Sequence, residues 1–289
     1  MVQTTERTAE LWVDDGIDDP TIDLYRTDAV ARGIAGFDAT TDEHIAQFHE
    51  RGFLVVADAF GPAEVQSALD GLLDLIDGAD PAFTGIQFEA KAVAKLPAMA
   101  REEKQDAVRK LMSFVEHDHR LSALSDHPRL IATLARMMGE QPALFQDQAL
   151  LKPPLIGREK PWHQDNAFFT VHPEATIIGV WIALDEAVPA NGCMHILPGT
   201  HRAGPVPHFQ RRDWQLCDTD IDVAKVVAVP LAPGGLLFFH GLLHHGTPPS
   251  RSPRRRRALQ FHYKPVSVGR VSDDERLRVF GADGKGKTC

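Results

Sequence analysis

The stretch Trp162-His163-Gln164-Asp165-Asn166-Ala167-Phe168-Phe169 decides the fold class of this chain. If it begins as a β-strand, residues at i and i+2 point to the same face of the strand. His163 and Asp165 then offer an imidazole and a carboxylate to one metal ion, while Gln164 faces away. His245 supplies a second imidazole from a distant strand. Two histidines and one carboxylate form a facial triad that leaves positions open on Fe(II), so the sequence predicts a non-haem iron site on a β scaffold.

The sequence around this stretch has a pattern that is typical of an all-β structure. After Gln141, short apolar runs alternate with Pro and Gly, and no helical pattern separates them. Many short strands without intervening helices indicate a sandwich or a barrel. The predicted strands cover residues 144–151, 161–165, 176–187, 193–197, 225–230, 235–240, 243–247 and 255–264.

The first half of the chain is helical in pattern. Thr41 or Asp42 can cap a helix that stops at Gly52, and Pro62 opens an amphipathic helix that runs to Gly78. A short apolar run at 53–56 predicts a buried strand between them. Two further helices are predicted near 101–115 and 128–138, and residues 80–100 are predicted to form a long loop that covers a site.

Composition excludes some classes of protein. The formal net charge of −9 argues against a general nucleic-acid binder, and the basic run at 251–257 is short. The hydrophobic content of 43% is ordinary for a globular chain. Cys193, Cys217 and Cys289 have spacings that predict neither a disulfide framework nor a zinc site, which favours a reducing, cytoplasmic location. No apolar run approaches the length of a membrane span, and the acidic N-terminus does not read as a signal peptide.

Four separate motifs carry a family resemblance. They are the stretch 162–169, the run Ile177-Ile178-Gly179-Val180-Trp181-Ile182-Ala183-Leu184-Asp185, the run 191–201 (Asn-Gly-Cys-Met-His-Ile-Leu-Pro-Gly-Thr-His), and Leu243-His244-His245-Gly246-Thr247. In this order they resemble the phytanoyl-CoA dioxygenase family of Fe(II)- and 2-oxoglutarate-dependent oxygenases, from about Thr41 to about Tyr263.

The resemblance implies a mainly β fold, a double-stranded β-helix (a cupin-like jelly roll), with an N-terminal helical region packed on it. It also implies a division of the chain. Residues 1–40 are expected to be a loosely attached extension and 41–270 a single oxygenase domain, with a helical front at 41–140 and the jelly roll at 141–265. Residues 271–289 are expected to be a tail.

The third metal ligand has several candidates. His245 precedes Gly246-Thr247, which matches the family's His-Gly-Ser/Thr pattern. His244 competes with it, because adjacent strand residues face opposite sides and only one reaches the metal. His240 is assigned to the preceding strand or its turn, and His262 to the cavity lining without a bond to iron.

Arg256 is the residue that points to 2-oxoglutarate. In a strand, Arg256, Ala258, Gln260 and His262 share one face, and the opposite face is apolar enough to pack on helices. A guanidinium holds a carboxylate through two parallel hydrogen bonds, and the resemblance places this one on the distal carboxylate of 2-oxoglutarate. It also places Thr247, Trp181 and Gln148 in the co-substrate pocket. Lys110, on the helix predicted before the barrel, is a further candidate for a carboxylate contact.

The expected activity is hydroxylation of a small organic molecule of lipid, amino-acid or natural-product type. Fe(II), 2-oxoglutarate and O₂ are the implied cofactor and co-substrates, ascorbate the implied stimulant, and succinate and CO₂ the implied products. Halogenating relatives have Gly or Ala at the carboxylate position, so Asp165 indicates hydroxylation. The alternative is a jelly-roll metal-binding protein without oxygenase activity, a binding or zinc-dependent hydrolytic module, which has no need of Arg256 and Thr247. Residues 80–100 and 203–222 are expected to select the substrate, and the sequence leaves the substrate and the oligomeric state open.

Overall fold

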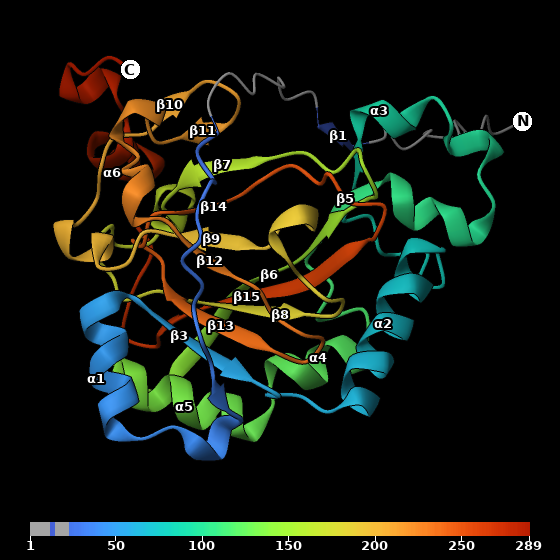
Figure 1. The fold of residues 1–289 in the computed structure, drawn as a ribbon, viewed down its shortest axis with the longest axis horizontal. Helices are drawn as coiled ribbons and strands as arrows, with labels where there is room; N and C mark the ends of the chain where they lie inside the picture. The colour runs from blue at the N-terminus through green and yellow to red at the C-terminus, as the bar shows by residue number, and fades with distance from the viewer. Residues whose placement is uncertain (1–11, 15–22) are drawn as a thin grey trace, which may run out of the picture.

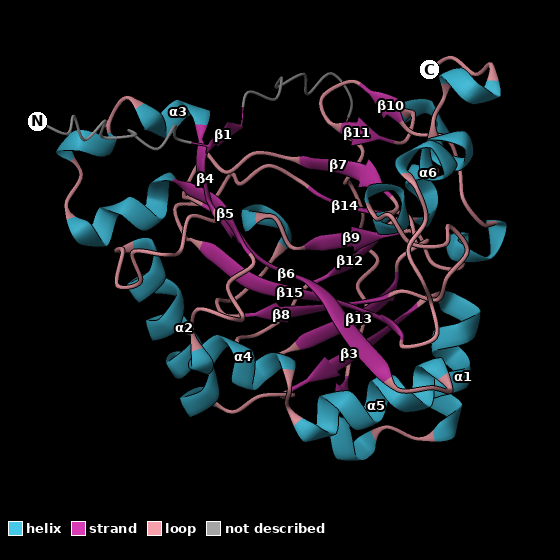
Figure 2. Ribbon diagram, turned by 180° about the vertical axis from the view of Figure 1, so that it is seen from behind, coloured by secondary structure: helices cyan, strands magenta, loops and turns pink. Residues whose placement is uncertain are grey.

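Two stacked β-sheets with helices on one side make up the protein (Figures 1 and 2). This computed structural model describes residues 12–14 and 23–289; the rest of the predicted N-terminal extension lies outside them. The strands are β1 Trp12–Asp14, β2 Ile34–Ala35, β3 Phe53–Ala57, β4 Ile86–Glu89, β5 Val108–Met112, β6 Pro142–Lys152, β7 Lys160–His163, β8 Ile178–Ala183, β9 Met194–Ile196, β10 Phe209–Gln210, β11 Trp214–Gln215, β12 Val227–Val229, β13 Leu236–His240, β14 His245–Thr247 and β15 Arg256–Pro265. The α-helices are α1 Asp42–Arg51, α2 Pro62–Ile76, α3 Ala90–Val93, α4 His119–Ser125, α5 Pro128–Met138 and α6 Asp273–Phe280.

The strand order is that of a jelly roll. The large sheet runs β1-β4-β5-β6-β15-β8-β13-β3-β2, the small one β12-β9-β14-β7, and β10 and β11 form a separate two-stranded sheet. Long-range antiparallel pairing, such as β15 between β6 and β8, brings distant segments together. The predicted mainly β double-stranded β-helix with helices packed on it is therefore confirmed.

Alternation along the central strands creates two hydrophobic cores. Leu236 and Phe238 of β13 face the helices, whereas Leu237 and Phe239 face the small sheet. On β15 the same rule sends Leu259, Phe261 and Tyr263 toward the helices, as the sequence predicted. The opposite face of β15 is therefore left for the space between the two sheets.

Helix boundaries follow their local signals. Thr41 caps α1, since its side chain accepts a hydrogen bond from the backbone N–H of His44. The helix ends at Gly52, whose φ of 81° is a left-handed conformation that glycine adopts without steric cost. Pro62 occupies the first turn of α2. The predicted helices at both places, and α5, are confirmed.

The region between α2 and α4 was predicted wrongly. Residues 101–115 form a 3₁₀ segment, Arg101–Ala107, followed by strand β5, so Lys110 lies on a strand. Part of the predicted loop 80–100 is β4 and α3. Local sequence favoured a helix here, but β5 gains hydrogen-bonding partners on both sides, β4 and β6, that only the folded sheet supplies.

Both ends of the described chain pack on the domain. Leu24 and Phe37 are buried and β2 pairs with β3, so close packing begins before Thr41. At the other end, the N–H of His208 donates to the carbonyl of Phe280 (2.7 Å).

The cysteine prediction was also wrong, because Cys217 and Cys289 form a disulfide. Their spacing gave no sign of it, since the two residues become neighbours only when the C-terminal segment docks beside β11. Cys193 remains a buried thiol. In the part of the chain that the structure describes, no helix combines the length and the apolar character needed to cross a membrane.

Candidate active site

Three buried side chains converge between the two sheets. His163 ends β7, Asp165 begins a 3₁₀ turn (Asp165–Phe168), and His245 begins β14. The Nε2 atoms of His163 and His245 lie 3.2 Å and 3.5 Å from Oδ1 of Asp165. One ligand atom from each residue lies within 4.8 Å of the others. His163 and His245 are direct partners across the β7–β14 pair, which fixes their separation.

Both imidazoles are oriented by a hydrogen bond at Nδ1. Nδ1 of His163 lies 2.7 Å from the carbonyl of Pro161, and Nδ1 of His245 lies 2.9 Å from the carbonyl of Leu243. A carbonyl only accepts, so each Nδ1 carries the proton and each Nε2 presents a lone pair. This is the orientation that a metal-binding histidine requires.

Asp165 reaches the histidines by a different route from the one predicted. The sequence reasoning placed His163 and Asp165 on one continuous strand, but β7 ends at His163 and the chain then turns. The turn is anchored by the two neighbours of Asp165. The amide of Gln164 bonds to the carbonyls of Gly204 and Leu242, and the amide of Asn166 bonds to the carbonyl of Pro173. Gln164 faces away from the triad, as the sequence predicted.

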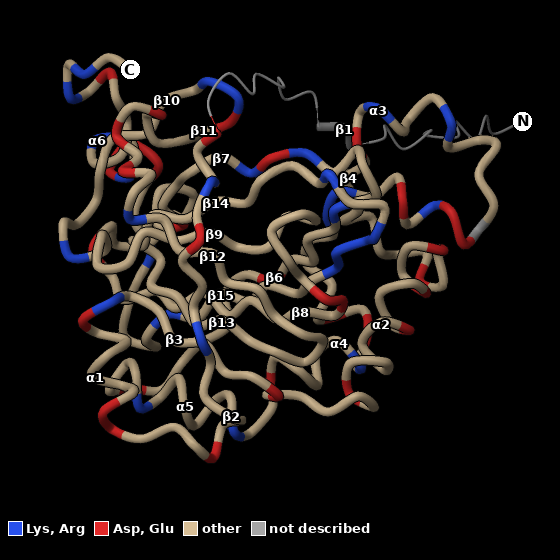
Figure 3. The backbone as a smooth tube through the Cα atoms, in the orientation of Figure 1, with Lys and Arg blue, Asp and Glu red and all other residues tan. Residues whose placement is uncertain are grey.

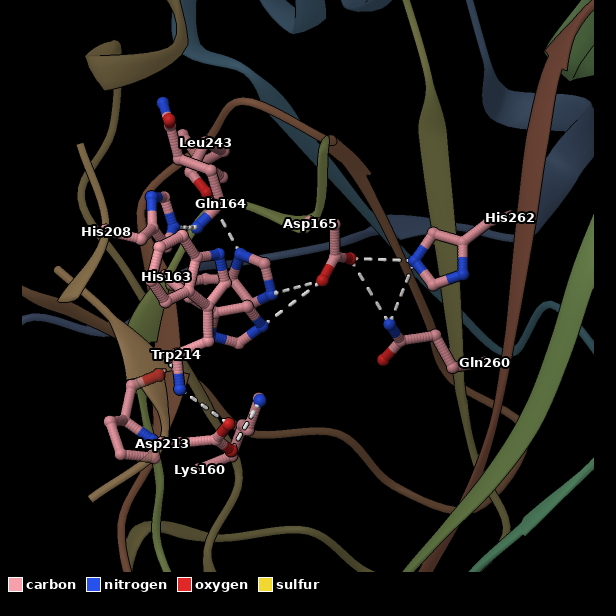
Figure 4. Close-up of polar contacts among 12 residues, drawn as sticks. Lys160, His163, Gln164, Asp165, His208, Asp213, Trp214, Leu243, Gln260 and His262 are labelled. Atoms are coloured by element: carbon pink, nitrogen blue, oxygen red, sulfur yellow. Dashed lines mark hydrogen bonds and ion pairs between the residues drawn. The ribbon is translucent and has the colours of Figure 1, made fainter. Parts of the chain in front are cut away.

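The second carboxylate oxygen of Asp165 is engaged on the opposite side (Figure 4). His262 Nε2 lies 2.7 Å from Oδ2, and the amide nitrogen of Gln260 lies 3.3 Å from it. His262 is fully buried. The sequence reasoning expected His262 to line the cavity, but His262 is not among the residues that line it and contacts Asp165 instead. The signal for this contact was present, since His262 and Gln260 share a strand face with Arg256.

The charge state of the triad suits a divalent metal. Burial alone would raise the pKa of the Asp165 carboxyl, but interactions with His245 and His262 outweigh it and hold that pKa well below its usual range. Burial, followed by repulsion from His245, lowers the pKa of His163 to about 4. An ionised carboxylate and a neutral imidazole are the forms that bind a cation, so the donor set fits Fe(II).

The other histidine candidates lie elsewhere. His244 stands outside the group of three, and its backbone N–H donates to the Thr200 hydroxyl (2.9 Å). His240 ends β13, and its Nδ1 accepts a hydrogen bond from the N–H of Leu242. The structure therefore brings His245, and neither of these two, to His163.

A cavity of about 730 Å³ contains the triad and most of the predicted co-substrate residues. Thr247, Gln148, Lys110 and Arg256 line it. Trp181 does not line this cavity. The centroid of its ring lies 5.5 Å from the guanidinium carbon of Arg256, so the ring packs against that side chain.

Arg256 differs from the other arginines of its run. Arg254, Arg255 and Arg257 each form an ion pair, with Glu186, Asp106 and Asp185 respectively. Arg256 is only 2% exposed and donates to the carbonyl of Leu150 (2.8 Å), while its Nε has no partner. Within residues 12–14 and 23–289, no ion pair of Arg256 with a carboxylate is found. Burial lowers its pKa to about 10. A buried, unneutralised guanidinium facing a cavity fits a bound carboxylate.

Known proteins share this sequence and architecture. A sequence model described as "Phytanoyl-CoA dioxygenase (PhyH)" matches residues 48–258. "Phytanoyl-CoA dioxygenase domain-containing protein 1" of Danio rerio is 24% identical over 262 residues, covering 78% of this chain and 90% of its own. "Phytanoyl-CoA dioxygenase 1" of Oryza sativa subsp. japonica is 27% identical over 252 residues, with coverages of 77% and 88%.

Solved structures agree in fold. The "non-heme alpha ketoglutarate dependent carbocyclase SnoK from nogalamycin biosynthesis" superposes with a TM-score of 0.64 at 18% identity, covering 83% of this chain and 91% of its own. "EctD from S. alaskensis with bound Fe" gives a TM-score of 0.64 at 21% identity, with 80% of each chain covered. Because the family match spans most of the chain and encloses the whole triad, the chain belongs to the phytanoyl-CoA dioxygenase family and is a non-haem iron, 2-oxoglutarate-dependent dioxygenase.

Proposed function

We propose that His163, Asp165 and His245 bind Fe(II), that Arg256 binds the distal carboxylate of 2-oxoglutarate, and that the protein hydroxylates a small organic molecule in the same cavity. The observation that carries this proposal is the placement of the unneutralised Arg256 guanidinium and the triad in one cavity. A metal-binding or zinc-dependent hydrolytic module has no use for a buried guanidinium beside its metal.

The remaining residues have supporting roles in this proposal. Thr247 lies two residues after His245 on β14 and offers a hydroxyl to the same carboxylate as Arg256. Gln148 and Lys110 lie on β6 and β5, on the wall of the cavity, and offer hydrogen bonds to the co-substrate. Trp181 packs against the guanidinium and holds it in place.

Iron with 2-oxoglutarate and O₂, when bound, supplies an oxidant strong enough for a C–H bond and leaves succinate and CO₂. The protein orients the partners and limits access of water. Phe168 and Phe169 line the cavity beside the triad and contribute an apolar wall there. A volume of about 730 Å³ is within the range of small-molecule sites, roughly 300–1,000 Å³.

Succinate release tests the proposed activity. The chain with Fe(II), ascorbate and O₂ should convert 2-oxoglutarate to succinate slowly by itself and faster with its substrate. Asp165→Ala should release none, because one metal ligand is lost. Zn(II) in place of Fe(II) should give none either. Hydrolytic activity with Zn(II), without succinate release with Fe(II), would establish the alternative module.

We further propose that residues 41–270 form the catalytic unit and that the protein works in the cytoplasm. The small number of cysteines supports that compartment. The Cys217–Cys289 bond argues against it, because disulfides persist mainly in oxidising compartments. Thiols are alkylated during lysis, and the mass of the whole chain then gives the number of alkylated cysteines. Three alkylated cysteines support the proposed cytoplasmic location, whereas a single one contradicts it.

A further inference from the structure

The turn that carries Asp165 also carries a residue of the cavity wall. It runs from Asp165 to Phe168, so the carboxylate of the triad stands at its beginning and an aromatic side chain of the cavity at its end. The Phe168 ring lies edge-on to the His163 ring, with 5.4 Å between the centroids. A shift of this one turn would therefore disturb both the metal position and the wall beside it.

The segment that follows β15 is paired with the residues just beyond this turn. Arg270 forms an antiparallel bridge with Val171, and the backbone N–H of Val271 donates to the carbonyl of Thr170 (3.1 Å). Helix α6 begins two residues later and contacts the turn itself. The start of the helix is thus fixed against the chain that leaves the metal site.

One side chain of α6 reaches the backbone of the turn. Nη1 of Arg276 donates to the carbonyl of Ala167 (2.6 Å), and Ala167 is fully buried. Nε and Nη2 of Arg276 bond to Oδ1 of Asp273, on the same helix, at 3.1 and 3.0 Å. The guanidinium is therefore oriented by its own helix and bonds to the peptide group that joins Ala167 to Phe168. A buried carbonyl that loses a donor is costly, so this bond stabilises one conformation of the turn.

The same helix supports the chain that enters the turn, through Phe280. The fully buried ring of Phe280 belongs to one apolar cluster with Ala167. The carbonyl of Phe280 accepts from the backbone N–H of His208 (2.7 Å), and Nε2 of His208 accepts from the backbone N–H of Gln164 (3.0 Å; Figure 4). Contacts from α6 therefore lead to the backbone on both sides of the triad carboxylate.

Helix α6 itself lies outside the cavity. In the part of the chain that the structure describes, the cavity-lining residues all precede residue 261. Acidic and basic residues stand close together along α6 (Figure 3). One of them, Arg278, is exposed, and its Nε donates to the carbonyl of Asp274 within the helix. The helix thus offers a matched pair, in which Arg276 is bonded to the turn and Arg278 to the helix.

Given the proposed function, we infer that Arg276 is a positioning residue for the metal site. Through the carbonyl of Ala167 it holds the turn in the conformation that brings the Asp165 carboxylate to the two triad histidines, and it keeps Phe168 on the cavity wall. It acts from outside residues 41–270, the proposed catalytic unit, so the C-terminal helix supports a metal site to which it contributes no ligand.

Metal titration of the folded chain tests this inference. Arg276→Met keeps an unbranched side chain of similar helix propensity but removes the donor. The Kd of Fe(II), measured anaerobically, should rise about three- to tenfold, which is less than the 10–100-fold typical of a direct partner of a metal ligand, because Arg276 acts through the turn. Arg276→Lys, which retains a donor, should recover part of the affinity. Arg278→Met, which removes the same charge from the same helix, should leave the Kd unchanged.

Hydrogen exchange in the metal-free chain separates positioning of the turn from a general loss of stability. Amides of residues 164–171 should exchange faster in Arg276→Met than in the parent and in Arg278→Met. Amides of β13, in the centre of the large sheet, should exchange at the parent rate in all variants, because their exchange requires the fold itself to open.

An unchanged Kd of Fe(II) in Arg276→Met would overturn the inference, and so would equal weakening in Arg276→Met and Arg278→Met. An Arg276→Lys chain as weak as Arg276→Met would overturn it too, since a donor to Ala167 would then not matter. Equally faster exchange in β13 would show that Arg276 serves the stability of the whole fold. If the parent chain binds no Fe(II), the proposed function itself fails. Tight binding by the parent and by every variant alike leaves that function intact and refutes only the role of Arg276.

Discussion

His262 Nε2 lies 2.7 Å from Oδ2 of Asp165, on the side of the carboxylate opposite the two triad histidines. The two oxygens of Asp165 are thereby divided: Oδ1 faces the proposed metal position and Oδ2 is held by the protein. Rotation of the carboxylate is restricted before any metal binds. His262 is in turn packed by Phe169, at 4.8 Å between ring centroids.

The first prediction concerns this contact. His262→Phe should keep the packing but release Oδ2, and the affinity for Fe(II) should fall about 10–100-fold, as when other partners of metal ligands are lost. Anaerobic Fe(II) titration measures it. His262→Gln, which retains an N–H donor, should recover part of the affinity. Unchanged iron affinity in His262→Phe would show that Asp165 is held by the turn alone.

The second prediction separates two adjacent histidines. His245→Ala removes a side chain of the triad, whereas His244→Ala removes one that lies outside it. Iron affinity should be lost in the first variant and remain within a few-fold of the parent in the second. The two variants are matched, since each deletes one imidazole from the same segment. Greater iron loss in His244→Ala would mean that His244 is the metal ligand and that the register of β14 is wrong by one residue.

Much of the fold follows from signals that act over a few residues. Thr41, Gly52 and Pro62 mark helix ends through their own capping and backbone preferences, and the structure uses them as predicted. The alternation along β15 correctly separates a cavity face from a helix-facing side. These features need no knowledge of the rest of the chain.

The errors arise where distant segments decide the outcome. Residues 108–112 are a strand because β4 and β6 pair with them, and the local pattern gave no hint of either partner. The bond between Cys217 and Cys289 depends in the same way on the docking of the C-terminal segment. The prediction placed Asp165 beside His163 through an extended strand, whereas the chain turns after His163. That turn is held by hydrogen bonds from the Gln164 side chain to the distant carbonyls of Gly204 and Leu242, which the local sequence does not reveal.

The third prediction concerns pH. His208 is fully buried, and its Nε2 accepts a hydrogen bond from the N–H of Gln164 (3.0 Å). Burial lowers its pKa to about 3, far below the ordinary value near 6.5. Between these two values His208 is protonated in the unfolded chain but neutral in the folded chain. The free energy of unfolding therefore falls as the pH falls through this range.

Urea unfolding of the metal-free chain at pH 6.5 and pH 5 measures this effect. His208 should account for a loss of about 2 kcal/mol in the free energy of unfolding between the two. His208→Gln, which does not titrate, should lose correspondingly less over the same interval, although other buried histidines also contribute to the slope. An identical pH dependence in the parent and the variant would mean that His208 does not stay neutral in the fold.

The last prediction concerns Arg256 and separates an oxygenase from any other metal protein. Arg256→Lys keeps a positive charge but loses the paired donors that match a carboxylate. A hydrogen bond to a charged group contributes about 1.5–3 kcal/mol, and about 1.4 kcal/mol corresponds to tenfold in affinity. The Kd of 2-oxoglutarate, titrated anaerobically with Fe(II) bound, should therefore rise by roughly one to two orders of magnitude. Arg254→Lys, in the same run but exposed and paired with Glu186, should leave it unchanged. Iron affinity should stay the same in both variants, because neither residue belongs to the triad. Equal weakening in both would mean that the run acts as a diffuse basic patch, and no weakening in Arg256→Lys would remove the main support for Arg256 as the anchor of 2-oxoglutarate.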